Sequence, residues 1–512
     1  MVERDAHRLR VRATPADTGT ARRFPARRTA AARADPARTV ACQPRPLRRS
    51  RHRRAKLRLP CPDIRQKTMT TTYPLHDALS HADTAFPPEA DVVIAGAGIM
   101  GCAAAYYLGR RGLKAVVLDK SRIAGQQSTR AWGFVRQQGR ESAEVPLMMA
   151  GMRIWEGLEQ ALGFDLEWRQ GGCLYLADND DDWASFQAWL TVAREHGLDT
   201  RTLTRAQIDE RVTGLSTHAR TLGGLYTATD GQAEPRRVAA AFAARATEAG
   251  ARFFEGCGVT AIETAGGAVV GVVTERGTIR TRRVICAAGA TSFRLLDGVG
   301  IRLPQQAVRG TCMRTNVLPD VSASTIWGHG LGIRQRKNGA INLADDMQVD
   351  VDLTLGHLRG LSLFWPEFWS QRDKFRLHLN ASAWRDVLAR ISGATGPIEP
   401  RDPQPQPNRA HAPRALAKLK AIFPALKDAQ IVEAWAGLID VLPDGIPVID
   451  APGTPSGLAI ATGFCGHGFA MGPIVGRLLA EWIDTGAPSL DLSAFRARRF
   501  VDGTMVRPRS ML

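Results

Sequence analysis

Three kinds of feature are missing from this sequence. It has no stretch of about 18 or more apolar residues, so no membrane span is predicted. Its eight cysteines are scattered and form no CxxC pair, which argues against a zinc site, an iron–sulfur cluster and a disulfide framework. No internal repeat stands out. We therefore predict no metal and a reducing, cytoplasmic setting.

Positive charge is concentrated at one end of the chain. The formal net charge of the 512 residues is +18, which would normally suggest a nucleic-acid or anionic-membrane partner. Residues 1–68 hold 18 Arg and two Lys against five acids, an excess of 15 that leaves +3 for residues 69–512. The folded body is therefore nearly balanced, and we predict no nucleic-acid partner for it. Its length suits two or three domains.

The basic tail at 1–68 has little apolar periodicity and many Arg, Ala and Pro, so we expect it to be disordered. Three interpretations stay open. The first is a transit peptide, because the segment is Arg-rich and acid-poor. The second is a basic arm that binds polyanions. The third is that the sequence has been extended too far at its start and that Met69 is the natural first residue. The sharp change in composition favours the third. No apolar segment follows its Arg pairs, so a secretory signal is not supported.

A dinucleotide-binding fingerprint opens the body of the chain. Four apolar residues at 92–95 predict a buried strand, and Gly-x-Gly-x-x-Gly follows at Gly96, Gly98 and Gly101. A helix is predicted at 99–108 and a second strand at 114–118. Asp119 follows this strand, where an acid accepts hydrogen bonds from a ribose. The glycines permit a tight turn, close approach of a pyrophosphate and close helix packing. The motif alone does not choose between NAD and FAD.

Further elements are predicted along the chain by their periodicity. Residues 121–139 are polar and Gly-rich, and we interpret them as a loop that crosses toward the cofactor. Residues 353–412 show no clear strand pattern, so we predict a helical excursion with a Pro-rich linker. Strands are expected within 171–177, 223–227, 251–280, 284–290 and 305–350, and helices at 145–162, 182–196, 204–212 and 238–249.

A second glycine-rich junction occurs near the C-terminus. A strand at 458–462 runs into Gly463, Gly466, His467 and Gly468, and a helix is predicted from 474 to 483. Pro473 suits the first turn of that helix. A second positive helix end can therefore face a ligand.

Together these stretches resemble the D-amino-acid oxidase/sarcosine oxidase-like (DAO) family of FAD-dependent oxidoreductases. The resemblance covers about 90 to 485. It is carried by the fingerprint with Asp119, by Asp230-Gly with Pro235, by the small residues at 287–290, by Pro443-Asp-Gly-Ile-Pro447, and by 461–468. The combination in this order is specific, and it implies FAD as the cofactor.

The resemblance implies an α/β fold class, with an α+β substrate domain. A discontinuous, Rossmann-like FAD-binding domain would take 89–145, 231–308 and 433–490. A substrate domain built on an antiparallel sheet would take 146–230 and 309–432, including the excursion at 353–412. Residues 69–88 would be a linker and 491–512 a C-terminal tail.

The resemblance also implies which residues hold FAD. Gly96, Gly98 and Gly101 would bind the pyrophosphate, and Asp119 the ribose. Gly466, His467 and Gly468 would approach the isoalloxazine or the substrate. The helix after them would point its positive end at the flavin. Val259 would lie near the adenine. We also predict cofactor contacts for Lys120, Ser128, Thr129 and Gly289.

We predict that FAD is bound without a covalent link. Some relatives attach flavin through a His in the loop after the second strand, or through a Cys near the C-terminal motif. Here that loop reads Gln126-Gln127-Ser128, and Cys465 lies within the glycine cluster without a firm match to the attachment Cys.

The implied reaction is oxidation of a C–N bond. A neutral amine loses hydride to the flavin, and the resulting imine hydrolyses. An amino-acid substrate then needs a carboxylate clamp, for which Arg is suited by its bidentate fork. Arg336 is the first choice, Arg136 the second, and Arg130 and Arg309 follow. The alternative for each of them is a solvated role at the surface. His467 either contacts substrate or shapes its loop.

Several alternatives stay open. The substrate is an amino acid or an N-substituted amino acid (D-amino acid, sarcosine-like or opine-like), or, in a different flavoenzyme class, a hydroxy acid or polyol phosphate. A third alternative is a non-catalytic FAD-binding partner protein. The electron acceptor is O2 or a quinone-type carrier. Some relatives work as one subunit of a hetero-oligomer with a redox partner, and the aromatic cluster at 364–369 leaves that open.

Overall fold

The structure is a computed structural model of the chain. It describes residues 84–507 except 346–348, 355–356, 358–359, 371, 380–383 and 385–399. The predictions for the tail at 1–68 and for Met69 lie outside the described residues. So do parts of the linker 69–88, of the excursion 353–412 and of the C-terminal tail.

A six-stranded sheet carries the glycine-rich turns. Its strand order is β20-β21-β12-β1-β2-β8, and every neighbouring pair is parallel except β20 with β21. Its strands are β1 (Val92–Ala95), β2 (Ala115–Leu118), β8 (Arg252–Phe254), β12 (Val284–Cys286), β20 (Val448–Asp450) and β21 (Leu458–Thr462). The turns after β1, β12 and β21 therefore meet at the carboxyl edge, where parallel sheets bind ligands.

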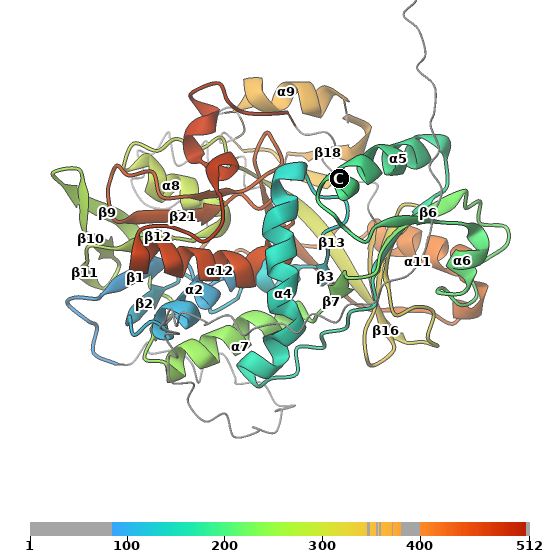
Figure 1. The fold of residues 1–512 in the computed structure, drawn as a ribbon, viewed down its shortest axis with the longest axis horizontal. Coiled ribbons are helices and arrows are strands. Elements are labelled where there is room, and N and C mark those ends of the chain that lie inside the picture. Colours follow the sequence, from blue (N-terminus) through green and yellow to red (C-terminus); the bar gives the residue numbers. More distant parts are fainter. Residues whose placement is uncertain are drawn as a thin grey trace, which may run out of the picture. The chain divides into compact units, whose positions relative to one another are not determined.

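The two faces of this sheet are covered differently (Figure 1). Val92 and Ile94 of β1 pack into a cluster with helices α2, α4, α7 and α12, whereas Val93 and Ala95 pack toward a three-stranded antiparallel sheet, β11-β10-β9. This alternation is that of a strand with both faces buried. The covering elements are α2 (Ile99–Gly109), α4 (Val145–Leu162), α7 (Pro235–Glu248), α12 (Gly468–Thr485), β9 (Val259–Ala265), β10 (Ala268–Thr274), β11 (Gly277–Arg280) and α8 (Ser292–Asp297).

A second, ten-stranded sheet is mostly antiparallel. Its order is β18-β17-β13-β16-β15-β14-β4-β6-β5, and β19 also pairs with β13. The strands predicted within 305–350 are thus confirmed. The members are β4 (Cys173–Ala177), β5 (Arg201–Leu203), β6 (Gly223–Thr227), β13 (Gln306–Val317), β14 (Thr325–Gly328), β15 (Leu331–Gln335), β16 (Ala340–Asp345), β17 (Val349–Asp352), β18 (Phe375–His378) and β19 (Ile431–Val441).

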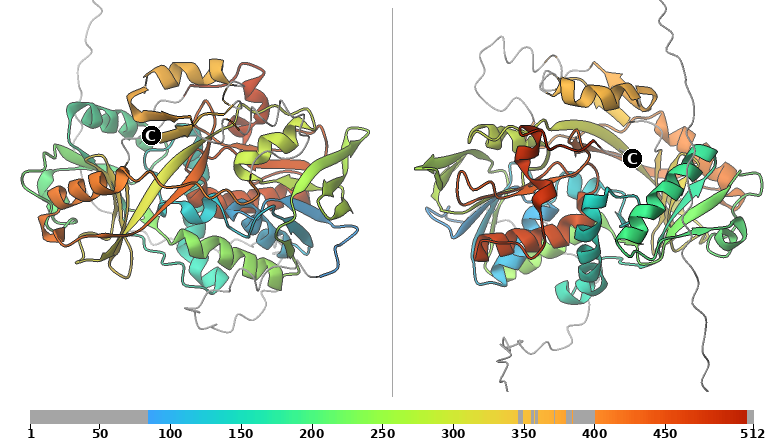
Figure 2. Two further views of the ribbon diagram at one scale, coloured as in Figure 1. Left: turned by 180° about the vertical axis from the view of Figure 1, so that it is seen from behind. Right: turned by 45° about the horizontal axis from the view of Figure 1, so that its top comes forward.

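Smaller elements complete the description (Figure 2). The strands β3 (Phe134–Val135) and β7 (Gly231–Gln232) form a short antiparallel pair, and α11 (His411–Ile422) packs on the larger sheet. The remaining elements are α3 (Gln127–Arg130), α5 (Asp180–Glu195), α6 (Arg205–Asp209), α9 (Leu361–Ser370), η1 (Ser142–Glu144), η2 (Gly289–Thr291), η4 (Arg372–Lys374), η5 (Pro424–Leu426), η6 (Ser493–Phe495) and η7 (Ala497–Phe500). Among the helices of the described residues, none combines the length and apolarity needed to cross a membrane.

The purely helical interpretation of 353–412 is wrong. Phe375–His378 forms the edge strand β18, in parallel register with Val349–Asp352 of β17. A distant strand supplies the hydrogen-bonding partners here, so tertiary pairing overrides a weak local pattern. Likewise, the loop predicted at 121–139 contains the one-turn helix α3 and the short strand β3.

The helix predicted at 474–483 begins earlier in the structure. α12 begins at Gly468 with His467 as its N-cap, so Pro473 lies inside the helix and not in its first turn. Packing explains this start, because Gly472 and Gly476 of α12 lie against Ile99 and Ala103 of α2. These contacts hold α12 against α2 on both sides of Pro473, at the cost of the hydrogen bond that Pro473 cannot donate.

The division into domains stays a prediction. The predicted boundaries at 308/309 and 432/433 fall inside β13 and β19, which pair with each other from Gln306 with Val441 to Thr315 with Ile431. This strand pair therefore runs across both predicted boundaries.

Candidate active site

The glycine-rich turn between β1 and α2 is packed tightly by protein atoms at Gly96 and Gly101 but not at Gly98. Gly96 has φ +106°, and a Cβ there would overlap the carbonyl oxygen of Ala287, while a Cβ on Gly101 would overlap that of Gly96. At Gly98, by contrast, a Cβ would approach only the side-chain atom Ser128 Oγ, at 3.2 Å, and no backbone atom of another segment. The protein itself therefore demands glycine at the first and third positions, and the second position is open to a ligand. This geometry fits a pyrophosphate at the N-terminus of α2.

Asp119 and Ser128 both contact this turn. Asp119 Oδ2 accepts the N–H of Ala97 at 2.8 Å, and its Oδ1 accepts the N–H of Ser121 at 2.7 Å. Ser128 Oγ accepts the N–H of Ile99 at 2.8 Å. Burial raises the pKa of Asp119 against these hydrogen bonds. The ribose contact of Asp119 stays a prediction, because its observed partners are backbone amides.

The other predicted cofactor residues surround the same edge. Lys120 lies against Gly258, the residue before Val259, since a Cβ on Gly258 would come within 3.1 Å of Lys120 Cβ. Thr129 Oγ1 donates to Ala124 O at 2.9 Å and so closes the loop before α3. Gly289 has φ +56° and follows β12. The structure thus gathers these residues, and their contacts with FAD stay predictions.

A buried carboxylate holds the second glycine junction in place. Asp440 Oδ2 accepts the N–H of Gly463 at 2.7 Å and an N–H of Gln305 at 3.1 Å. Gln305 also donates to Thr462 Oγ1 at 2.8 Å and to Gly289 O at 3.1 Å. Asp440 therefore links the turns after β12 and β21, the two turns that we expect to lie beneath the flavin.

The two glycine junctions also touch through their helices. A Cβ on Gly468 would come within 3.3 Å of Met100 Cε, and a Cβ on Gly476 would overlap Ala103. α2 and α12 therefore pack side by side at a distance that only small residues allow (Figure 1). Their N-termini consequently lie at the same edge of the sheet.

Cys465 is engaged within the protein. Its Sγ donates to Gly463 O at 3.2 Å and accepts the N–H of Leu442 at 3.3 Å. Burial raises the pKa of this thiol well above its ordinary value. A thiol in that state is a poor nucleophile, which supports non-covalent FAD.

Three of the four candidate arginines have other partners. Arg336, the first choice, pairs with Glu167 at 2.9 Å and with Glu234 at 3.1 Å. Arg309 pairs with Asp352 at 2.9 Å, and Arg130 donates to the carbonyls of Ala436 and Gly125 and to Gln404 Oε1. These partners occupy the groups that a substrate carboxylate would need. The geometry therefore does not support Arg336 as the clamp.

Arg136 differs from the other three. It donates to Gln138 O, and its guanidinium lies 5.7 Å from the ring centroid of Tyr175. No carboxylate pairs with it in the described part of the chain. An arginine that is half-buried, stacked on an aromatic ring and without an acidic partner is free to bind an anion.

The loop of Arg136 is held by the buried carboxylate of Asp230. Asp230 Oδ1 accepts the N–H of Gln137 at 2.7 Å, and Oδ2 accepts that of Gln138 at 3.1 Å. Burial raises the pKa of Asp230 to about 6, against these hydrogen bonds. The Asp230-Gly motif thus positions the loop that presents Arg136.

His467 forms a hydrogen bond with the buried side chain of Glu144, which lies 323 residues away in sequence. His467 Nδ1 lies 3.2 Å from Glu144 Oε1, and the Glu144 side chain is 0% exposed. Burial and the charge of Arg140 lower the pKa of His467 to about 4. His467 is therefore neutral at physiological pH. Arg140 is itself 4% exposed, and its Nη1 has no hydrogen-bond partner among the described residues.

Aromatic rings line the region next to Arg136. Trp132 and Trp327 lie 4.9 Å apart between ring centroids, Phe134 lies 6.1 Å from Trp327, and Tyr175 lies 6.1 Å from Trp327. Trp132 lies in the loop before β3, Phe134 lies in β3, and Tyr175 and Trp327 lie in the larger sheet. An apolar wall beside one unpaired cation is the composition of a small-molecule site.

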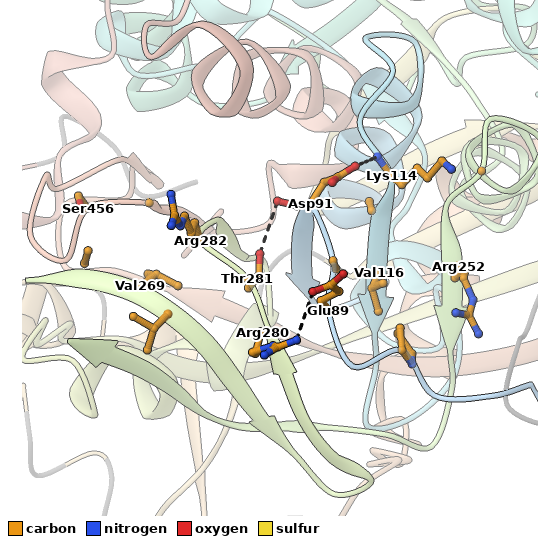
Figure 3. Close-up of a pocket in the computed structure, with 17 residues that line it drawn as sticks. Glu89, Asp91, Lys114, Val116, Arg252, Val269, Arg280, Thr281, Arg282 and Ser456 are labelled. Carbon is orange, nitrogen blue, oxygen red and sulfur yellow. Dashed lines mark hydrogen bonds and ion pairs between the residues drawn. The ribbon is translucent and has the colours of Figure 1, made fainter.

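A cavity of about 1040 Å³ lies elsewhere and is not this site. It opens at the amino ends of β1, β2 and β8, as Figure 3 shows for Asp91, Lys114 and Arg252. Its charged groups partly pair with one another, for example Arg280 with Glu89 at 3.4 Å. Cofactors bind at the carboxyl ends of parallel strands, so this cavity lies at the opposite end from the glycine turns.

Comparison with known families agrees with the site geometry. A family model described as FAD dependent oxidoreductase (DAO) matches residues 91–482, which is most of the chain. The chain belongs to this family. The oxidoreductase thus binds FAD, and the prediction that FAD and not NAD occupies the fingerprint is confirmed. The predicted fold class is confirmed as well.

Individual relatives of the oxidoreductase are distant. Sarcosine oxidase subunit beta of Rhizobium meliloti is 28% identical over 82% of this chain and 90% of that protein. Human mitochondrial sarcosine dehydrogenase is 24% identical over 83% of this chain but only 43% of its own length. L-amino acid deaminase from Proteus myxofaciens, solved with anthranilate, superposes with a TM-score of 0.75 at 24% identity, covering 84% and 96% of the two chains.

Sequence reasoning missed several residues of the site in this oxidoreductase. Glu144 and Arg140 were not singled out, although two acids just before the predicted helix at 145–162 were a visible signal. Asp440 carried no signal, because its role depends on the turn after β21. Within the described residues, no group of three or more His, Cys, Asp or Glu side chains could hold a metal ion.

Proposed function

We propose that this chain catalyses the FAD-dependent oxidation of the C–N bond of an amino acid or N-substituted amino acid. D-amino acids, sarcosine-like and opine-like compounds are the candidate substrates. The observation that carries the proposal is Arg136, a stacked guanidinium without a carboxylate partner in the described residues, beside an aromatic wall and the second glycine junction. The names of the sarcosine-oxidising relatives support the same class of substrate.

Each part of the site has a separate task in this reaction. FAD, held at the two glycine junctions, would supply the oxidising power as the acceptor of a hydride from the carbon next to the substrate nitrogen. Arg136 binds the substrate carboxylate through two parallel hydrogen bonds. The rings of Trp132, Trp327 and Tyr175 exclude water from that ion pair and strengthen it. The imine product then hydrolyses to a carbonyl compound and an amine.

The arginine assignment moves from Arg336 to Arg136 in this proposal. Arg336 lies between two carboxylates and is 10% exposed, so its charge is already balanced. A substrate carboxylate there would add a third negative charge. At Arg136 the same carboxylate finds a guanidinium that, unlike those of Arg336 and Arg309, forms no ion pair with a described acid.

An anaerobic substrate panel tests the proposal. Purified yellow protein is mixed without oxygen with D-amino acids, N-methyl amino acids, opines and, as a contrast, hydroxy acids. We expect bleaching of the flavin with an amine and none with a hydroxy acid. Readmission of air then distinguishes acceptors, because fast recovery of the colour indicates O2 and slow recovery a quinone-type carrier. Protein that never bleaches with any amine would overturn the proposal.

The clamp is tested by a matched pair of arginine variants. Arg136→Gln should raise KM for the best amino acid by about tenfold or more, since a charge-assisted hydrogen-bond pair is lost. Arg153→Gln, at an exposed position on α4, should leave KM unchanged. An amine that lacks a carboxylate should lose little on Arg136→Gln. Equal effects on both amines would remove Arg136 from the clamp role.

We also propose that the chain works with a second subunit. Its relative from Rhizobium meliloti is named as a subunit beta. In addition, Trp365 and Trp369 on α9 are 48% and 58% exposed, so apolar surface on this helix is uncovered. The complex isolated from its source should sediment well above the 55.6 kDa of one chain and contain a second polypeptide. A chain that sediments alone would contradict this.

A further inference from the structure

The pairing of His467 with Glu144 fixes which imidazole nitrogen carries the proton. Burial raises the pKa of Glu144, but the hydrogen bond with His467 and the charges of Arg140 and Arg136 outweigh it and lower this pKa, so Glu144 is a carboxylate. A carboxylate only accepts hydrogen bonds. The proton of the neutral imidazole must then lie on Nδ1, 3.2 Å from Glu144 Oε1.

The second imidazole nitrogen is left with a lone pair. Nε2 of His467 makes no hydrogen bond to any described residue, and the side chain keeps 15% of its exposure. His467 is the N-cap of α12 between two glycines, so no neighbouring side chain on its own loop covers it. A hydrogen-bond acceptor is therefore presented at the end of the second glycine junction.

The surrounding charges decide what this acceptor can bind. Arg136 and Arg140 face His467 from the loop after β3, and Glu144 faces it from η1. Two guanidiniums against one carboxylate repel a further cation, which disfavours an ammonium at this point. A neutral amine N–H is the donor that such a site accepts.

We propose that Nε2 of His467 accepts a hydrogen bond from the N–H of the substrate amine, and that Glu144 is the positioning residue that keeps it an acceptor. Arg136 would hold the carboxylate of the same substrate. The site would thus select primary and secondary amino acids, which carry an N–H as neutral amines, over tertiary ones, which do not. This inference rests on the proposed function.

The test compares one substrate pair across three proteins. The pair is the best N-methyl amino acid of the panel and its N,N-dimethyl analogue. The natural protein should prefer the first in kcat/KM by about tenfold or more, because a tertiary amine leaves the acceptor unpaired. Glu144→Gln should reduce this preference to about threefold or less, since an amide can donate to Nδ1 and release the tautomer. His329→Asn, which removes another His beside a carboxylate, Asp178 at 3.4 Å, should keep it.

A second measurement does not depend on turnover. Nitrogen NMR of holoenzyme labelled in its histidines reports the tautomer of His467, assigned by the loss of one signal in His467→Ala. We expect the Nδ1–H form alone in the natural protein and a mixture of forms in Glu144→Gln. His467→Ala should lose the substrate preference even where Glu144→Gln folds poorly.

The outcomes separate the two proposals. An Nε2–H tautomer, or a preference that survives in both variants, would overturn the role of His467 and leave the proposed function standing. Failure of every amine to bleach the flavin would instead overturn the proposed function, while the tautomer would still be read from the spectrum.

Discussion

The buried carboxylate of Asp230 accepts the backbone N–H of Gln137 at 2.7 Å. This bond joins the strand pair β3 and β7 to the loop that presents Arg136 one residue earlier. A carboxylate that satisfies two successive backbone amides fixes the direction of the loop between them. The position of the proposed clamp is therefore set by a residue that does not itself touch substrate.

Removal of that carboxylate should loosen the clamp. For Asp230→Ala we expect about 1–3 kcal/mol lower free energy of unfolding, because two buried N–H groups lose their acceptor. KM for the best amino acid should rise about tenfold, with a smaller effect on an amine that has no carboxylate. Denaturant unfolding and steady-state kinetics measure the two effects. A stability loss without a change in KM would show that the loop keeps its position unaided.

The raised pKa of Asp230 predicts a pH dependence of stability. Its pKa is about 6 in the folded protein against 3.8 as its ordinary value, so the folded state favours the protonated form. The stabilising contribution is complete below about pH 4 and is lost as the pH rises through 6. Unfolding free energies of the natural protein and of Asp230→Asn should therefore diverge by about 3 kcal/mol across this window. Parallel curves would contradict the shift.

Substitution of Arg336 should affect stability more than substrate binding. Arg336→Ala removes the cation that Glu167 and Glu234 share. We expect this loss to lower the free energy of unfolding by about 3 kcal/mol. KM of the folded enzyme should stay within about twofold. A large rise in KM with little loss of stability would return Arg336 to the clamp role.

The close contact of α2 and α12 predicts an effect on flavin content. Gly476→Ala places a methyl group against Ala103, which should cost about 1–3 kcal/mol and reduce bound flavin by separating the two junctions. Gly157→Ala, in α4, is the matched control, because no described atom lies within 4 Å of its Cβ position. That control should be neutral or stabilising by up to about 1 kcal/mol.

Denaturation tests the mode of FAD binding. Acid precipitation of the yellow protein should leave all flavin in the supernatant, since the half-buried thiol of Cys465 is hydrogen-bonded within the protein and the described loop after β2 has no His. Flavin that remains in the pellet would show a covalent link.

Much of the first junction could be predicted from the sequence. Four apolar residues, three spaced glycines and an acid after the next strand define a local unit whose parts lie within about 30 residues, so periodicity and turn chemistry suffice. β1, α2 and β2 all form where they were predicted. The order of the later glycine motifs was enough to identify the family and hence FAD.

The partners of the charged residues could not be predicted. Arg136 and Arg336 are both arginines next to glycine-containing turns, and no local feature distinguishes them. The difference arises because Glu167 and Glu234 form ion pairs with Arg336, whereas no described acid forms one with Arg136. The edge strand β18 and the long strand β19 were missed for a similar reason, since their pairing partners lie far away in sequence.

The sequence by itself determined the cofactor, the class of fold and the two glycine-rich strand-to-helix junctions. Only the tertiary structure decided which arginine is left unpaired and that Glu144 meets His467 across 323 residues. The physical reason is the range of the interactions. Backbone conformation depends on neighbouring residues, whereas the charge and protonation of a buried side chain depend on whatever distant groups the fold brings within a few ångströms.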